Sequence, residues 1–340
     1  MIKKVIIPVV VVLSIGSVFA AKMAKPNKEM DVVLKTLQEK GGKPIETLSA
    51  PEARKQPTPT DAVKTVEKTK NDAPAPVVAV KEIQLDGAAG PIPARIYIPA
   101  GANKPMPVVV YYHGGGFVIA DNNVYDATPR SLADQTKSIF VAVEYRKGPE
   151  HKFPAAHDDA FAAYKWVLKN AGSFDGDPKR VAVAGESAGG NLALNVAIMA
   201  RDEKIQKPTH ELLVYPLAGS YMGTSSYKEN ANAKPLNREM MGWFMNNYLT
   251  HPEQKNDKRI NLLTANFQGL GDATIITAQI DPLRSEGREL ADKMKSQGVD
   301  VTYKNYNGVT HEFFGMGSVL KEARDAQALA SKELTKSFRQ

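Results

Sequence analysis

The feature that most constrains this chain is an apolar run that passes through a glycine-rich turn into a helix-like segment, at residues 180–200. The run Val181–Ala184 predicts a buried strand, and the residues after Gly190 repeat apolar side chains at helical spacing. Between the two stands the motif Gly-x-Ser-x-Gly, centred on Ser187. A strand, a sharp turn and a helix around such a serine are typical of a nucleophile elbow.

The two glycines of this motif have a steric purpose. The turn is so sharp that side chains at Gly185 and Gly189 would collide with neighbouring segments. The helix after Ser187 directs its free N–H groups and the positive end of its dipole at the site, where an oxyanion would be stabilised. The motif is short, so an ordinary glycine-rich turn between a strand and a helix is the alternative interpretation.

Composition bounds the size and the partners of the protein. The chain has 340 residues, of which 43% are hydrophobic and 24% charged, enough for one large α/β domain with an accessory part or for two small domains. The net charge of +7 is spread along the chain, without a basic stripe interleaved with aromatic residues, so we expect no nucleic-acid partner. Because there is no cysteine, disulfides and thiol catalysis are excluded.

Residues 1–20 have the pattern of a secretory signal peptide. Lys3 and Lys4 precede the largely apolar run Val5–Phe19, and a cleavage site is expected after Ala20. The alternative is a retained membrane anchor, but as a helix this run would span only ~22 Å, less than the ~30 Å hydrocarbon core of a bilayer. We therefore expect a periplasmic or secreted protein with no stable membrane insertion after cleavage.

The segment 21–79 is open to two interpretations. Met30–Gln38 has helical spacing, whereas residues 44–76 are rich in proline, lysine, alanine and threonine. The segment is therefore either a flexible linker or a cap of short helices over a site.

From residue 80 onward, apolar strands alternate with helices. Strands are expected at Ile83–Leu85, Ala94–Ile98, Pro107–Tyr112, Ile139–Tyr145, Val181–Ala184, Leu212–Leu217, Thr274–Ile280 and Val301–Tyr306. Helices are expected within Phe153–Asn170, after Ser187, at Arg284–Ser296 and at Val319–Phe338. This alternation predicts an α/β fold at residues 80–340, with a mostly parallel twisted sheet and helices on both faces. The segment 219–261 interrupts it with a methionine-rich helix, suited to packing or to forming a lid.

Two further residues fit a catalytic role beside Ser187. A serine hydroxyl needs a base, and His311 follows the last expected strand, while Asp281 follows the strand before it. Their order, Ser187, Asp281 and His311, is the order found in α/β-hydrolases. Because parallel strands end at one edge of a sheet, we expect the three side chains to meet there as nucleophile, orienting acid and base. The alternatives are a helix cap for Asp281 and a surface loop for His311.

The sequence His113-Gly114-Gly115-Gly116 follows the strand Pro107–Tyr112. Three glycines expose backbone N–H groups, which together with the N–H of Ala188 can form an oxyanion hole. A flexible turn without a ligand is the alternative. His113 is expected to orient the loop by hydrogen bonds, and its competing role is that of the catalytic base.

Taken together, these motifs resemble the hormone-sensitive lipase family of α/β-hydrolases, the bacterial family IV esterases. The resemblance lies in HGGGF at 113–117, EYRKGPEHKFPAAHDD at 144–159, GESAGGNLA at 185–193, DPLRSEG at 281–287 and HEF at 311–313. It implies an α/β-hydrolase fold whose helical cap is formed by residues 21–79 and an insertion at about 219–261. It also implies a triad of Ser187, Asp281 and His311, with oxyanion donors at Gly115, Gly116 and Ala188.

Two departures from the family pattern are present. Glu186 stands where many members have aspartate, and Lys147-Gly148 replaces the more usual Leu-Ala. The first keeps the charge of the side chain, and the second lies outside the triad.

The resemblance therefore predicts a serine carboxylesterase for short- to medium-chain esters, acting through an acyl-enzyme and without a cofactor. No metal is expected at His151, His157, Asp158 or Asp159. The expected partner is a small-molecule ester, and a homodimer is compatible with the sequence. Two alternatives stay open: an amidase or peptidase with the same triad, and a non-catalytic binding protein like the gibberellin receptors, which lack the catalytic histidine.

Overall fold

The computed structural model of the protein describes residues 23–70 and 78–339; the expected signal peptide lies outside the described residues. An eight-stranded sheet has the order β1-β2-β4-β3-β5-β6-β7-β8. The strands are β1 (Val78–Gly87), β2 (Gly90–Pro99), β3 (Met106–Tyr112), β4 (Ile139–Val143), β5 (Gly176–Glu186), β6 (His210–Val214), β7 (Asp272–Ile280) and β8 (Val301–Thr310). Only β2 runs against its neighbours, so the expected mostly parallel sheet is confirmed.

The parallel strands are apolar throughout because both of their faces are covered. On β3, Val108, Val110 and Tyr112 belong to the hydrophobic cluster on one face of the sheet. Val109 and Tyr111 belong to the cluster on the other face. Successive side chains of a strand point to opposite faces, so a strand between two layers of helices must be apolar at every position.

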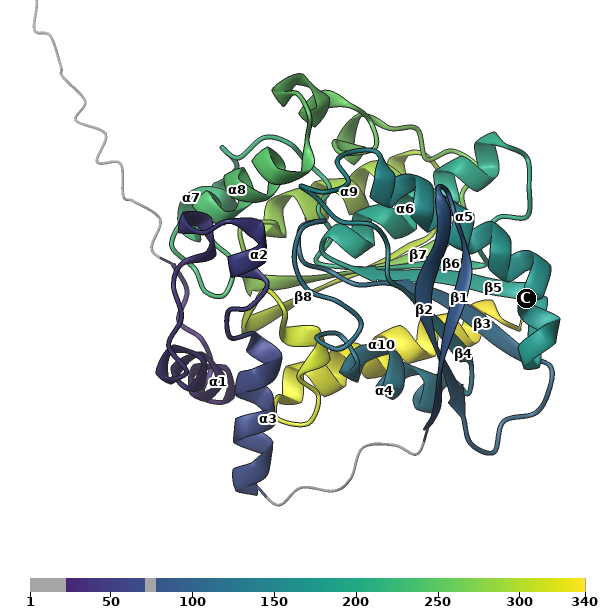
Figure 1. The fold of residues 1–340 in the computed structure, drawn as a ribbon, viewed down its shortest axis with the longest axis horizontal. Coiled ribbons are helices and arrows are strands. Elements are labelled where there is room, and N and C mark those ends of the chain that lie inside the picture. The colour runs from purple at the N-terminus through teal and green to yellow at the C-terminus, as the bar shows by residue number, and fades with distance from the viewer. Residues whose placement is uncertain (1–22, 71–77, 340) are drawn as a thin grey trace, which may run out of the picture.

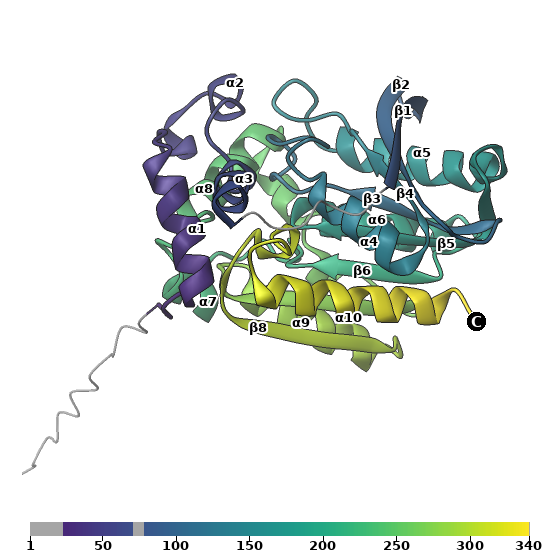
Figure 2. The same cartoon turned by 90° about the horizontal axis from the view of Figure 1, so that it is seen from below.

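Helices cover the two faces in separate layers (Figures 1 and 2). The first layer contains α5 (Ala155–Asn170), α6 (Ala188–Asp202) and α9 (Arg284–Ser296), and the second contains α4 (Ala127–Thr136) and α10 (Lys321–Ser337). The sequence did not indicate α4. The only leucine and alanine side chains that this helix buries are those of Leu132 and Ala133. Such a short apolar stripe gives little periodic signal.

The boundaries of several strands differ from those expected, and the differences at β6 and β8 bear on the site. The run Leu212–Leu217 predicted one strand, but β6 ends at Val214. Tyr215 has a φ of +34°, and Pro216 has no N–H group to donate to a neighbouring strand. Conversely, β8 continues beyond the expected Val301–Tyr306, and it brings the chain up to His311.

A third group of helices gathers at one end of the sheet (Figure 1). From the N-terminal segment come α1 (Lys28–Glu39), α2 (Ala50–Ala53) and α3 (Pro59–Lys70), and from the insertion come α7 (Ser225–Glu229) and α8 (Arg238–Tyr248). The two parts touch, since the indole N–H of Trp243 on α8 donates to the carbonyl of Leu48 at 3.0 Å. We call these five helices the cap helices.

Short 3₁₀ helices complete the described elements, at Ile45–Thr47, Ala171–Phe174, Pro252–Asn256, Leu262–Thr264 and Phe313–Gly315. Over residues 23–70 and 78–339, every helix is too short or too polar to cross a membrane.

Candidate active site

Ser187 lies at the sharp turn between the end of β5 and the start of α6. Its backbone has φ +56° and ψ −118°, a conformation that L-residues rarely adopt. A Cβ atom on Gly189 would lie 1.9 Å from the carbonyl oxygen of Tyr112, and one on Gly185 would lie 2.1 Å from the carbonyl oxygen of Gly189. The two glycines therefore let three segments approach closely enough to hold Ser187 in its strained conformation.

The structure brings Ser187, His311 and Asp281 into one hydrogen-bonded chain. His311 Nε2 lies 2.9 Å from Ser187 Oγ, and His311 Nδ1 lies 2.7 Å from Asp281 Oδ2. The other oxygen of Asp281 accepts the backbone N–H of Leu283 at 2.8 Å, in the turn that leads into α9. The N-cap of α9 is Leu283, and no side chain caps the start of this helix, so the helix-cap alternative for Asp281 is wrong.

Burial and charge act in opposite directions on His311. Burial lowers the pKa of His311, but the charge and hydrogen bond of Asp281 outweigh it, so the pKa is raised above 6.5. Asp281 is fully buried, and Ser187 is 7% exposed. An imidazole with a raised pKa is a stronger base toward the serine hydroxyl.

The glycine loop after β3 lies beside Ser187. Gly115 and Gly116 have φ values of +100° and +60°, and a Cβ atom on Gly115 would lie 2.2 Å from the carbonyl oxygen of Ile119. Both glycines line the same cavity as Ser187 and Ala188, the arrangement that an oxyanion hole requires. Glycine is needed at Gly115 because a side chain would meet the loop's own backbone.

His113 contacts the backbone of this glycine loop. Its Nδ1 donates to the carbonyl of Gly114 at 2.6 Å, and its ring stacks on Tyr145 with the centroids 4.4 Å apart. Burial lowers the pKa of His113 to about 4, so the ring stays neutral at physiological pH. These contacts fit the expected orienting role, whereas His311 is the histidine hydrogen-bonded to Ser187.

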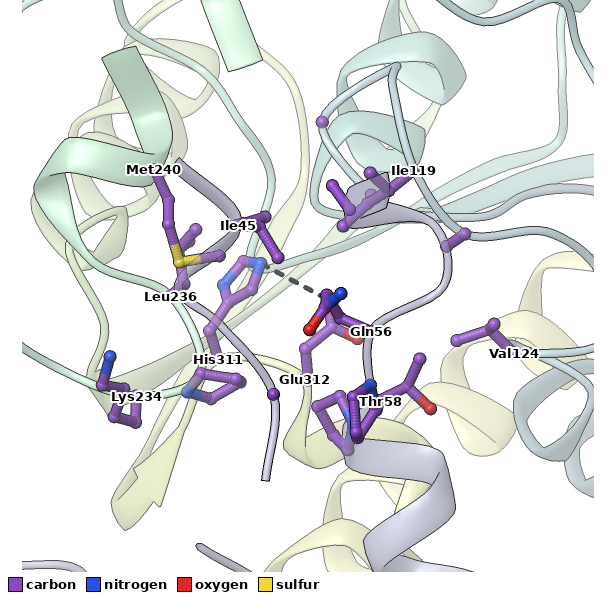
Figure 3. Close-up of a pocket in the computed structure, with 18 of the residues that line it drawn as sticks. Ile45, Gln56, Thr58, Ile119, Val124, Lys234, Leu236, Met240, His311 and Glu312 are labelled. Carbon is purple, nitrogen blue, oxygen red and sulfur yellow. Dashed lines mark ion pairs between the residues drawn. The ribbon is translucent and has the colours of Figure 1, made fainter. Parts of the chain in front are cut away.

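A cavity of about 800 Å³ opens above Ser187, between the sheet and the cap helices. Apolar atoms form the larger part of its wall, and polar side chains such as Gln56 and Lys234 lie among them (Figure 3). The larger aliphatic, methionine and phenylalanine side chains of the wall are Leu34, Leu37, Ile45, Ile119, Val124, Leu217, Leu236, Met240, Met241, Phe244 and Met245. Both the N-terminal segment and the insertion contribute to this wall, so the two parts expected to form a cap meet at the serine.

Arg54 fastens the N-terminal segment to the loops beside the oxyanion glycines. Its guanidinium donates to the carbonyls of Val118 at 2.8 Å and Gly148 at 2.7 Å. It also pairs with both carboxylate oxygens of Glu150, at 2.8 and 2.7 Å. Lys147-Gly148, one of the two departures from the family pattern, thus lies where the cap is attached.

Glu186, the other departure, is buried beneath Ser187. Tyr111 donates to one of its oxygens at 2.5 Å, and Tyr215 donates to the other. Burial, together with the charge of Glu312, raises the pKa of Glu186 to about 7. The ring of Tyr215 packs on His311 with the centroids 4.4 Å apart, so Glu186 is linked to the base through the ring contact of Tyr215.

Glu312 is a site residue that the sequence did not reveal. It lines the cavity next to His311, and its Oε1 lies 3.8 Å from His311 Nε2 (Figure 3). The same oxygen accepts the hydroxyl of Tyr125 at 2.6 Å. Adjacency to His311 was the only signal in the sequence, because Tyr125 is 187 positions away.

Two residues of the run 151–159, His157 and Asp159, are engaged in structural contacts. His157 bonds the hydroxyl of Tyr248 at 2.9 Å and the side chain of Asn191 at 3.0 Å, and Asp159 pairs with Arg146 at 2.7 Å. In the part of the chain that the structure describes, no group of three histidine or acidic residues could hold a metal ion.

Comparison with known proteins places this geometry in a family. A sequence model of the α/β-hydrolase fold family matches residues 109–315. Carboxylesterase NlhH of Mycobacterium tuberculosis is 36% identical over 239 residues, which cover 69% of this chain and 75% of the relative. An ethyl acetate hydrolase of Pseudomonas putida is 30% identical over 295 residues, 86% of this chain and 91% of that protein.

Solved structures agree with these relatives. The hyperthermophilic esterase of the archaeon Pyrobaculum calidifontis superposes with a TM-score of 0.83 at 33% identity, covering 92% of this chain and 99% of that one. A thermostable esterase from Pseudomonas putida ECU1011 superposes with a TM-score of 0.84 at 31% identity, over 92% and 98% of the two chains. The chain therefore belongs to the α/β-hydrolase fold family, within the hormone-sensitive lipase branch that its motifs indicated.

Proposed function

We propose that this protein is a serine carboxylesterase that hydrolyses its substrate through an acyl-enzyme on Ser187. The observation that carries the proposal is the chain of hydrogen bonds from Ser187 through His311 to Asp281, which opens into an apolar cavity. The relatives named carboxylesterase and ethyl acetate hydrolase support ester hydrolysis as the reaction.

Each step of the reaction has a group of the chain to perform it. His311 Nε2 takes the proton of Ser187 Oγ as the oxygen attacks the ester carbonyl, and Asp281 stabilises the resulting imidazolium. The N–H groups of Gly115, Gly116 and Ala188 bind the oxyanion, a contribution of roughly 3 kcal/mol for each donor. His311 then protonates the leaving alcohol, and water repeats the sequence to release the acid.

We propose short- to medium-chain acyl groups as the preferred substrates. The cavity of about 800 Å³ has a mostly apolar wall, and residues of the cap helices α1 and α8 form part of it. An apolar wall favours a longer acyl chain until the chain reaches the cap, because each buried methylene contributes about 0.8 kcal/mol.

The test is hydrolysis of p-nitrophenyl esters of increasing acyl length by the protein without residues 1–20, beside Ser187→Ala. The serine variant should lose about 10⁶-fold in kcat. Turnover that survives in Ser187→Ala would overturn the proposed nucleophile. Faster turnover of palmitate than of acetate or butyrate would overturn the chain-length preference, and faster cleavage of matched anilides would identify an amidase.

We also propose that the protein is exported to the periplasm or beyond, through the signal peptide expected at residues 1–20. The support is the basic start and the fifteen-residue apolar run Val5–Phe19. Mass spectrometry of the mature chain from a fractionated culture is the test. A chain that begins at Ala21 in the periplasmic or extracellular fraction is expected, and an uncleaved chain in the cytoplasm would contradict the proposal.

A further inference from the structure

Glu312 has a backbone conformation that costs conformational energy. Its φ is +71°, in the left-handed region, where a residue other than glycine, asparagine or aspartate is disfavoured by roughly 1 kcal/mol or more. Its side chain is 22% exposed and lines the cavity over Ser187. A strained backbone that places a carboxylate beside the catalytic histidine points to a role in the reaction.

The geometry around Glu312 defines where the carboxylate is held. Tyr125 donates its hydroxyl to Oε1 at 2.6 Å. The ring of Tyr125 also supports the glycine loop, because a Cβ atom on Gly114 would lie 2.2 Å from its hydroxyl. The carboxylate oxygen is therefore fixed between the oxyanion loop and His311, and it retains a second lone pair for another donor.

The distance from Glu312 Oε1 to His311 Nε2 is 3.8 Å, too long for a direct hydrogen bond. A polar pair at such a distance is suited to sharing a water molecule. One water oxygen can lie about 2.8 Å from both atoms and donate one hydrogen to each. Its lone pairs then face away from both acceptors, toward the position of an acyl group on Ser187.

An alcohol in the same place cannot make both bonds. Its single hydroxyl hydrogen must go to His311 Nε2, which leaves the carboxylate of Glu312 facing an alkyl group. We propose that Glu312 positions the deacylating water and thereby selects hydrolysis over transfer of the acyl group to an alcohol. This role rests on the proposed acyl-enzyme.

Hydrolysis and alcoholysis of the acyl-enzyme follow the same sequence of bond changes and proton transfers. In hydrolysis the water oxygen bonds to the acyl carbon, its proton passes to His311 Nε2, and the bond from that carbon to Ser187 Oγ breaks as the oxygen recovers the proton. In alcoholysis the alcohol oxygen forms the new bond, and the product is an ester in place of the acid. Only the second hydrogen of water distinguishes the two nucleophiles at Glu312.

The experiment measures how one acyl-enzyme divides between the two products. p-Nitrophenyl butyrate is supplied in buffer with methanol, and butyric acid and methyl butyrate are quantified by gas chromatography. Their ratio depends on the acyl-enzyme alone, so it does not change with the amount of folded protein or with the acylation rate. A fold defect therefore cannot imitate the expected result.

Three variants make the test specific. Glu312→Gly removes the carboxylate and suits the positive φ, and we expect the methyl butyrate fraction to rise about tenfold relative to acid, the value of one hydrogen bond to a charged group. Glu312→Gln keeps an acceptor oxygen and should give an intermediate ratio. Glu211→Gln makes the same change at a buried carboxylate of β6 outside the cavity and should leave the ratio unchanged.

The outcomes separate this role from the proposed function. An unchanged product ratio in Glu312→Gly, with turnover that depends on Ser187, would overturn the role of Glu312 alone. Turnover that is independent of Ser187 would overturn the acyl-enzyme and the role of Glu312 together. A ratio that shifts equally in Glu211→Gln would show a general effect of charge removal and would overturn the role of Glu312.

Discussion

Asp281 makes the largest contribution to the raised pKa of His311, with smaller ones from Glu312 and Glu186, and this sets the expected pH profile. Burial lowers the pKa of His311 and Asp281 raises it, with a net value above 6.5. Since His311 must be neutral to accept the serine proton, kcat/KM should rise with pH and have its midpoint above 6.5. Steady-state rates on p-nitrophenyl butyrate from about pH 5 to about pH 9 measure this midpoint.

Asp281→Asn is the matched variant for this profile. It removes the charge that opposes burial, so the midpoint should move to lower pH, and kcat should fall about 10⁴-fold because the imidazole is no longer held in the correct tautomer. A wild-type midpoint below 6.5, or one that does not move in Asp281→Asn, would contradict the proposed pairing.

Gly189 is the residue at which a single methyl group should do most damage. A Cβ atom there would lie 1.9 Å from the carbonyl oxygen of Tyr112 at the end of β3. Neither segment is free to move, because β3 lies inside the sheet and α6, which carries Gly189, packs against it. We expect Gly189→Ala to lower the free energy of unfolding by about 3 kcal/mol or more. Urea denaturation followed by circular dichroism gives this value.

The control for this variant is Gly172→Ala. Its Cβ atom would meet nothing within 4 Å, and its φ is not positive. The expected change in unfolding free energy is within about 0.5 kcal/mol. Equal stability of the two variants would show that the close approach at the elbow is not required.

The sequence predicted the hydrogen-bonded chain of Ser187, Asp281 and His311 because each member has a recognisable place at the end of a strand. Glu312 and Tyr125 do not belong to a motif from which their contact could be predicted. Their contact joins positions 187 residues apart. The positive φ that directs the side chain of Glu312 into the cavity is a property of the folded backbone. Residue roles that depend on a distant partner cannot be read from spacing alone.

At the scale of elements, the attachment of the cap depends on Arg54. The guanidinium bonds two backbone carbonyls beside the oxyanion loop as well as Glu150. In Arg54→Ala we expect the cavity wall to loosen and kcat/KM for p-nitrophenyl butyrate to fall about tenfold, since hydrogen bonds from a charged donor contribute about 1.5–3 kcal/mol. The loss should be smaller for the acetate ester, which reaches less of the cap.

Glu150→Gln separates the two kinds of contact that Arg54 makes. It removes the ion pair at the surface, where such pairs contribute about 0–1 kcal/mol, and retains both carbonyl bonds. Its kcat/KM should stay within about threefold of the wild type. If Glu150→Gln is as impaired as Arg54→Ala, the carbonyl bonds do not hold the cap.

The N-terminal segment shows why a cap and a linker are hard to distinguish in a sequence. Its prolines suggested an irregular chain, but Pro51 lies in the first turn of α2 and Pro59 is the first residue of α3. Proline is favoured at these positions because the N–H it lacks would have no partner within the helix. Proline can therefore either end one helix or begin the next. Only the tertiary contacts decide whether such a segment is a linker or a cap.

At the scale of the whole molecule, alternation of apolar strands and helices was enough to predict the sheet and its two layers. It was not enough to predict how the cap is assembled. The bond from Trp243 to Leu48 joins positions 195 residues apart, and each side of the contact is only partly buried. The apolar residues of the cap segments face a shared cavity. Their spacing in the sequence therefore does not show which segment packs against which.

The stability of the whole domain should depend on pH through a carboxyl group in the sheet. Burial, with the charge of Asp272 adding to it, raises the pKa of Glu211 from 4.5 to about 8. The folded state therefore holds this proton more tightly than the unfolded chain does. Its contribution to stability is complete below pH 4.5 and is lost as the pH rises to about 8, at about 1.4 kcal/mol per pH unit.

Glu211→Gln removes this dependence, because the amide does not titrate. Between about pH 5 and about pH 8 the wild type should lose about 2 kcal/mol or more of unfolding free energy beyond the loss in the variant, measured by urea denaturation at both pH values. Glu253→Gln, at an exposed position, should keep the wild-type slope. Equal slopes for Glu211→Gln and the wild type would mean that Glu211 ionises in the folded state as readily as in the unfolded chain, and that the sheet accommodates a buried charge beside Asp272.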